Sequence, residues 1–169
     1  MMDITPEDFT GRVAGHVTAD DKFDRFVETC QFATRAIFVN RGYELQYPMI
    51  ALADEHHVWF MPSRPGLLED LLDAVREEAQ ERGATWFFVA VPTLVGWDHV
   101  TGDERSDVDT PDDGTHEQLE PGIYWHAASK VGSYYRRRAG LSRFTESDLS
   151  PFRDLPADQP TEMFDKVLA

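Results

Sequence analysis

An acidic stretch in the second half of the chain places oxygen-bearing side chains at the spacing of a calcium-binding loop. Asp109, Asp113 and Glu120 stand at the first, fifth and twelfth positions of such a loop, and Gly114 stands where the turn glycine belongs. The third position is a proline, which has no side-chain oxygen. The stretch 101–120 holds eight acids and one arginine, a formal charge of −7. We expect a solvated acidic loop, and a low-affinity divalent-cation site is the alternative.

Two neighbouring histidines, His56 and His57, are candidate metal ligands, with His99 and His126 as further donors. Adjacent residues of a strand point to opposite faces, so both could bind one ion only if the pair lies in a turn. No His or Cys pair has the spacing of a zinc site. We therefore expect a solvent-exposed histidine pair at the end of a hairpin and assign no metal there.

The single cysteine, Cys30, falls on the apolar stripe of an expected helix. A catalytic thiol needs a base and access to substrate, whereas a small buried side chain needs neither. We expect Cys30 to be buried in the core. The chain also has no glycine-rich phosphate loop, no GxSxG elbow and no dinucleotide fingerprint. The sequence thus indicates no cofactor and no particular reaction.

One segment, 130–143, carries five cationic residues and no acid. Arginine and aromatic side chains are concentrated on partner-binding surfaces. The alternative is that these arginines fold back onto acidic residues of the same chain, because a charge run is usually a solvated face. The residues that we assign to a partner-binding surface are Lys130, Tyr134, Tyr135, Arg136, Arg137, Arg138 and Arg143.

The chain as a whole is strongly acidic. Its 169 residues include 31 Asp and Glu but only 16 Lys and Arg, which gives a formal charge of −15. The self-repulsion of such a chain is nearly abolished at about 1 M salt, where the Debye length is only about 3 Å. An acidic surface also argues against non-specific binding to nucleic acid. This composition favours a cell interior at molar salt.

The composition resembles that of haloarchaeal proteins over the whole chain. Small α+β proteins of this kind are common in the tailed viruses of those cells, as head, tail and connector components. This resemblance implies a structural or accessory role, with a location in the cytoplasm of a high-salt cell or in a virion. No motif carries it, so it transfers no functional residue.

The pattern of apolar residues predicts one domain over 1–169, with a core at about 5–92, the acidic loop at about 101–120 and a C-terminal packing and contact segment at 122–169. The N-terminus lacks the basic and apolar regions of a signal peptide, and no apolar run could span a bilayer. Glycines and prolines bound the expected elements. These are helices at 5–15, 20–42, 65–83, 129–138 and 161–168, and strands at 47–53, 57–61, 84–91 (stopped by Pro92) and 122–127.

The strand at 84–91 is apolar on both faces, with Phe87 and Val89 on one face and Phe88 and Ala90 on the other. Such a strand must be covered on both faces. We expect the two long helices to cover one face, and the C-terminal third or another protein to cover the second. From the C-terminal third, the residues available for this are Tyr134, Phe144, Phe152 and Phe164.

Together these patterns predict an α+β fold. Its core would run helix, helix, strand, strand, helix, strand, with a small mixed sheet and an irregular C-terminal third. The last of these strands would run parallel to the second. We expect a non-enzymatic structural or protein-interaction module of a halophile or its virus, which binds a protein partner or itself. The alternative is a metal-assisted hydrolase that uses an acidic cluster.

Overall fold

A computed structural model describes residues 3–4, 19–40, 47–61, 64–97, 104–106, 120–144, 149–155 and 162–169. The helix expected at 5–15 and most of the acidic stretch lie outside these residues. The described elements are, in chain order, β1 (Asp3–Ile4), α2 (Ala19–Asn40), β2 (Met49–Ala53), β3 (Val58–Met61), α3 (Leu68–Arg82), β4 (Trp86–Trp97), β5 (Glu104–Ser106), β6 (Glu120–Val131), β7 (Tyr134–Arg143), β8 (Arg153–Asp154), α4 (Glu162–Asp165) and the short 3₁₀ helix η1 (Lys166–Leu168).

The strands form one eight-stranded sheet in the order β1-β3-β2-β4-β6-β7-β8, and β5 pairs with β4 beyond the end of β2. Every described pair of neighbouring strands is antiparallel. The α+β class is therefore confirmed, but the mixed sheet is wrong. The reason is that β2 lies between β3 and β4. The strand β4 does run in the same direction as β3, as expected, but the two strands are not neighbours.

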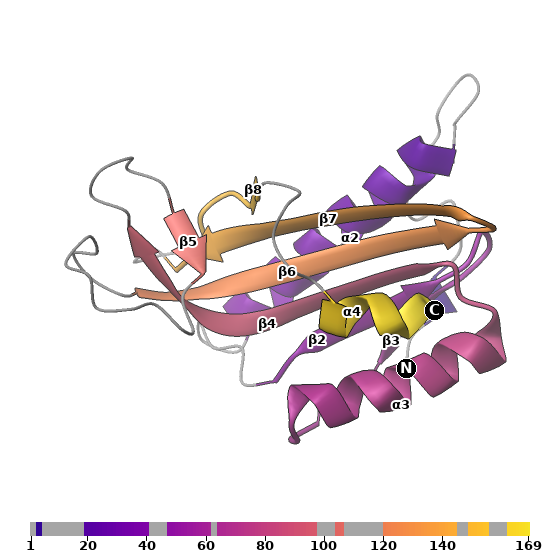
Figure 1. Cartoon of the computed structure of the whole chain (residues 1–169). Coiled ribbons are helices and arrows are strands. Elements are labelled where there is room, and N and C mark those ends of the chain that lie inside the picture. The colour runs from indigo at the N-terminus through magenta and orange to yellow at the C-terminus, as the bar shows by residue number, and fades with distance from the viewer. Residues whose placement is uncertain are drawn as a thin grey trace.

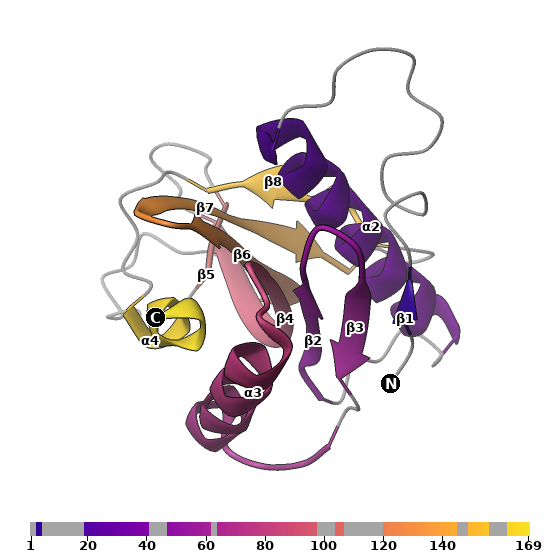
Figure 2. The same ribbon diagram turned by 90° about the vertical axis from the view of Figure 1, so that its right-hand side faces the viewer.

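Helices cover both faces of this sheet, so the fold has three layers (Figures 1 and 2). The helix α2 packs on one face through Phe23, Phe26 and Cys30, against a cluster that includes Trp125 of β6. On the other face, α3 packs beside the C-terminal α4 and η1, whose Phe164 enters the second cluster. The expectation that the two long helices share one face is wrong. Because β4 is apolar on both faces, each face receives one of them.

Both long helices form where the spacing of apolar residues predicts them. The buried residues of α3 are Leu71, Leu72, Val75 and Ala79, which repeat at three and four residues. Gly83 ends this helix in the left-handed conformation, with φ of 65°. The hairpin of β2 and β3 is likewise confirmed by their antiparallel register.

The largest departure from the sequence prediction lies after residue 120. The segment 129–138 was expected to be helical, and the C-terminal third irregular. Instead β6 and β7 form a long hairpin that closes at Gly132 and Ser133. Gly132 has φ of 61°, which a two-residue turn of this kind requires and which glycine adopts without strain. The spacing of the few apolar residues in this segment did not distinguish a helix from two partly exposed strands joined by a turn.

The strand β4 continues past Pro92, which was expected to stop it. Pro92 pairs with Ile123 of β6. On its other side, the described ladder with β2 ends at Ala90 and the ladder with β5 begins at Val95. Proline is tolerated in a strand where its missing N–H is not needed, and this gap between two ladders is such a place.

Candidate contact site at the hairpin end of the sheet

Three connections meet at one end of the sheet, which we call the hairpin end. They are the β2–β3 turn, the loop between α3 and β4, and the β6–β7 turn (Figure 1). Two backbone hydrogen bonds hold them together. The Thr85 N–H donates to the carbonyl of Ala53, and the Lys130 N–H donates to the carbonyl of Thr85, both at 2.8 Å. Residues far apart in the sequence are thereby fixed side by side.

A pocket of about 380 Å³ opens at the hairpin end. Its wall combines charged side chains with an indole and an aliphatic group. The hydroxyl oxygen of Thr85 is buried and has no hydrogen-bond partner among the described residues. Such mixed walls suit the side chain of a protein partner, which brings both apolar surface and hydrogen-bonding groups. The lining residues are Lys22, Asp54, Glu55, His56, Thr85, Trp86 and Val131.

The histidine pair lies in the β2–β3 turn, and His56 is part of the wall of this pocket. Both histidines are exposed, as expected. The Asp54 carboxylate holds the turn, because one of its oxygens accepts the backbone N–H groups of His56 and His57 at 2.7 Å each. The His57 ring stacks on Trp59, with 5.7 Å between ring centres. His126 belongs to the buried part of β6, and His99 lies outside the described residues.

The β6–β7 turn presents two large apolar side chains beside the pocket. Val131 is 50% exposed and Tyr134 is 55% exposed. They face each other across the hairpin, directly next to the two turn residues. Side chains in opposed positions of an antiparallel pair lie on the same face of the sheet. Val131 and Tyr134 therefore form one small apolar surface, which we call the hairpin tip.

The arginines of the same hairpin are held by carboxylates of their own chain. Arg136 and Arg138 point toward α2, and each places a guanidinium nitrogen 3.1 Å from Asp24. Arg138 also binds Asp154 of β8 at 2.9 Å and lies 5.5 Å from the centre of the Trp125 ring. These contacts join β7 to α2 and to β8. This is the intramolecular arrangement that the sequence left open as the alternative.

Arg137 points to the opposite face, where it binds Asp165 of α4 at 2.7 Å. The hydroxyl of Tyr135 donates to the same carboxylate at 3.1 Å. Burial, together with the negative charge of Asp165, raises the pKa of Tyr135 to about 12. Arg143, at the far end of β7, is half-buried. Of the predicted partner-binding residues, Tyr134 is the exposed apolar one, while Arg136, Arg137 and Arg138 link elements of the fold.

Beneath Arg137 lies the buried histidine of β6. His126 is fully buried, its ring stacks on Phe164 at 4.7 Å, and neither ring nitrogen has a partner among the described residues. Burial, and secondly the charge of Arg137, lowers the pKa of His126 to about 4. The imidazole is therefore neutral at pH 7 and acts as part of the core.

The remaining candidate residues are the cysteine and the acidic residues of the stretch 101–120. Cys30 is fully buried, and burial raises the pKa of its thiol, so the expected core role is confirmed. Asp109 and Asp113 lie outside the described residues, while Glu120 begins β6 opposite Val95. Part of the acidic stretch is the strand β5, so the expectation of a loop is wrong for Glu104–Ser106. Within the described part of the chain, no group of three His, Cys, Asp or Glu residues could hold a metal ion.

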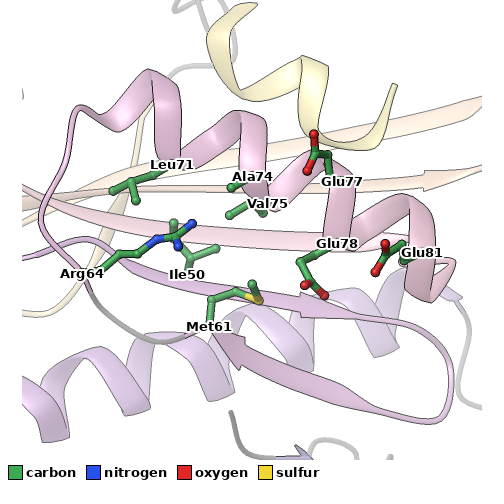
Figure 3. Close-up of a pocket in the computed structure, with 9 residues that line it drawn as sticks. All are labelled: Ile50, Met61, Arg64, Leu71, Ala74, Val75, Glu77, Glu78 and Glu81. Atoms are coloured by element: carbon green, nitrogen blue, oxygen red, sulfur yellow. The ribbon is translucent and has the colours of Figure 1, made fainter.

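A second hollow, of about 340 Å³, lies between α3 and the β2–β3 hairpin. Figure 3 shows Ile50 and Met61 of the sheet facing the apolar side of α3, with Arg64 beside them and Glu78 above Met61. The Glu78 carboxylate is already bound to Arg82 of the next turn at 3.0 Å. The hollow therefore has an apolar floor and a rim whose charges are partly satisfied within the chain.

Comparison of the chain with protein-family models, with curated proteins and with solved structures finds no match. Nor does any helix in the described residues have the length and apolar character needed to cross a membrane. A function has to be inferred from the residues themselves. The pocket residues Lys22, Thr85 and Val131 had no sequence signal, because only the packing of α2 on the sheet and the register of its strands bring them together.

Proposed function

We propose that this protein is a non-enzymatic structural or interaction module that binds a protein partner at the hairpin end. The observation that carries the proposal is the hairpin tip. Val131 and Tyr134 are both about half exposed, and Val131 also lines the pocket. Aromatic and aliphatic side chains beside a pocket are typical anchors of protein interfaces. Lys130 lies on the same hairpin, opposite Tyr135, and so on the other face of the sheet from the tip.

The arginine segment has a different part in this proposal. Arg136 and Arg138 fix β7 against α2 and β8, and Arg137 fixes it against α4. They hold the hairpin in place so that its tip projects as a rigid element. A rigid contact surface loses less conformational entropy on binding than a mobile one. We therefore assign binding to the tip and positioning to the three arginines.

The composition supports the further proposal that the module works at high salt, in a halophile or in one of its viruses, as a head, tail or connector component. A formal charge of −15 favours solubility in molar salt. Apolar contacts retain their strength there, whereas exposed charge pairs are screened. An apolar hairpin tip is thus a suitable contact for such a medium. The described residues supply no observation in favour of the alternative, a metal-assisted hydrolase.

Site-specific photo-crosslinking in the native host tests this proposal. Tyr134 is replaced by a photoreactive phenylalanine derivative, which keeps an aromatic ring at the hairpin tip. Met163 on α4, which is 47% exposed and therefore similar in accessibility, receives the same derivative as the matched control. Irradiation of cells should give a discrete crosslinked species from position 134 that position 163 does not give. Equal or absent crosslinking from the two positions would contradict the proposal.

A further inference from the structure

The outer face of α2 carries the most exposed aromatic ring among the described residues. Phe32 is 73% exposed in the middle of a helix of 22 residues. Val39 follows two turns later and is 45% exposed. Residues at these spacings share one side of a helix, and Ala36 lies between them. The opposite side, with Phe26 and Cys30, is buried against the sheet.

Charged residues flank this apolar stripe, and their pattern is complementary to that of a second copy of the helix running in the opposite direction. Glu28 precedes Phe32 by one turn, and Arg35 follows it by about one turn. When two copies of α2 lie antiparallel with their Phe32 side chains at the centre, Glu28 of each copy faces Arg35 of the other. A two-fold contact between identical surfaces requires this self-complementarity. Arg35 has a contact within its own chain, and its guanidinium offers five N–H donors, enough for a second partner.

We propose that two copies of this chain associate through α2, in an antiparallel contact centred on Phe32. The stem of Arg25 would cover Val39 of the second copy at each end of the contact. This interface is separate from the hairpin end, and it goes beyond the function proposed above. A component with one self-contact and one contact to another protein could build an assembly, which neither contact could do alone.

Sedimentation equilibrium in about 1 M KCl, where the repulsion between two acidic chains is screened, tests the proposal. The wild-type chain should form a dimer of its 19.3 kDa monomer at concentrations up to about 100 µM. Phe32→Glu should raise the dissociation constant by about 100-fold or more, because it places two carboxylates at the centre of the contact. Leu67→Glu is the matched control, since Leu67 is also 73% exposed but lies before α3 on the other face of the sheet.

Charge exchange then tests the orientation of the two helices. Glu28→Arg should weaken the dimer by about tenfold, and adding Arg35→Glu should restore most of the affinity. Within one chain these residues are about 10 Å apart along the helix, so rescue requires the second copy. A wild-type chain that stays monomeric would overturn the proposal. So would a dimer that Leu67→Glu weakens as much as Phe32→Glu does, or a failed rescue by a double variant with a native circular dichroism spectrum.

Discussion

The two parts of the β6–β7 hairpin differ in how they use their side chains. In its middle, Arg136, Arg137 and Arg138 are bound to Asp24, Asp154 and Asp165 of three other elements. At its tip, Val131 and Tyr134 are large, apolar and about half exposed. The charged part thus stabilises the fold, and the apolar part faces outward. In most proteins the reverse distribution would be expected.

This difference follows from the composition of the chain. With about two acids for every cation, an arginine has many carboxylates of its own chain within reach. A guanidinium that binds two carboxylates, as Arg138 does, is worth more to folding than a solvated one. In a strongly acidic protein, cationic residues therefore form ion pairs within the chain first. Residue type alone does not identify a binding surface.

The largest expected effect lies at the base of the hairpin. A Cβ atom on Gly140 would overlap the carbonyl oxygen of Arg153 and the indole of Trp125. Gly140→Ala should lower the free energy of unfolding by about 3 kcal/mol, because backbone and a buried ring must both shift. Ser133→Ala in the turn should change it by less than about 0.5 kcal/mol. Denaturant unfolding measures both values, and a Gly140→Ala variant as stable as the wild type would contradict the packing described.

A second prediction concerns His126, in the buried part of the hairpin. Its folded pKa of about 4 lies below the ordinary value of 6.5, so the folded state binds fewer protons than the unfolded state. The stability that this histidine contributes is full above pH 6.5 and is lost as the pH falls toward 4, by about 3 kcal/mol in total. His126→Met should remove this part of the pH dependence. The free energy of unfolding is measured between pH 7 and pH 4 for both proteins. An equal decrease in the two would show that the imidazole is not buried.

A third prediction concerns the effect of salt on the melting temperature, which differs for the acidic surface and for the arginine ion pairs. Raising KCl from about 0.1 M to 2 M should raise the melting temperature by about 4 °C or more, because repulsion among the carboxylates is screened. The partly buried Arg138 links should survive the same change, since screening acts mainly on solvated charges. Calorimetry at the two salt concentrations measures the shift. An unchanged or lower melting temperature would contradict the salt-adapted interpretation.

Much of the fold could be predicted because local signals there were unambiguous. The stripe of α3 ended by Gly83, the stripe of α2, and the β2–β3 hairpin all appear as expected. The prediction of a helix at 129–138 was wrong because the spacing of its residues fits the helical and the strand period equally well. Only a partner strand decided between them, and that information is not local. The position of β2 between β3 and β4 could not be predicted either, since the order of strands in a sheet depends on long-range pairing.

The candidate site could be predicted only in part. That the segment 130–143 binds a partner stays a prediction, although Tyr134 is exposed on it. What its arginines bind could not be derived, because Asp24 lies 112 residues away from Arg136 in the sequence. The same applies to the pocket, whose residues come from four separate parts of the chain. Interpretation of a charge run requires knowledge of which acids the fold brings near it.

The Arg138 links should make a moderate contribution to stability. Arg138→Gln should lower the free energy of unfolding by about 1 to 2 kcal/mol, because it removes hydrogen bonds to two carboxylates and the contact with Trp125. Lys130→Gln, on the same hairpin, is the control and should change it by less than about 0.5 kcal/mol. Chemical unfolding at fixed salt gives both values. Equal effects would show that Arg138 is a solvated charge.

The smallest effect on stability, and the largest on binding, is expected at the hairpin tip. The double variant Val131→Ser with Tyr134→Ser should unfold within about 0.5 kcal/mol of the wild type, since both side chains are about half exposed. The most direct test compares this variant with Arg138→Gln. For each variant it measures the unfolding free energy and the amount of partner protein that co-purifies, the partner being the one identified by crosslinking from position 134. The tip variant should keep its stability and lose the partner, and Arg138→Gln should lose stability and keep the partner. A tip variant that retains the partner would contradict the assignment of binding to the tip. An Arg138→Gln variant as stable as the wild type would contradict the assignment of positioning to the arginines.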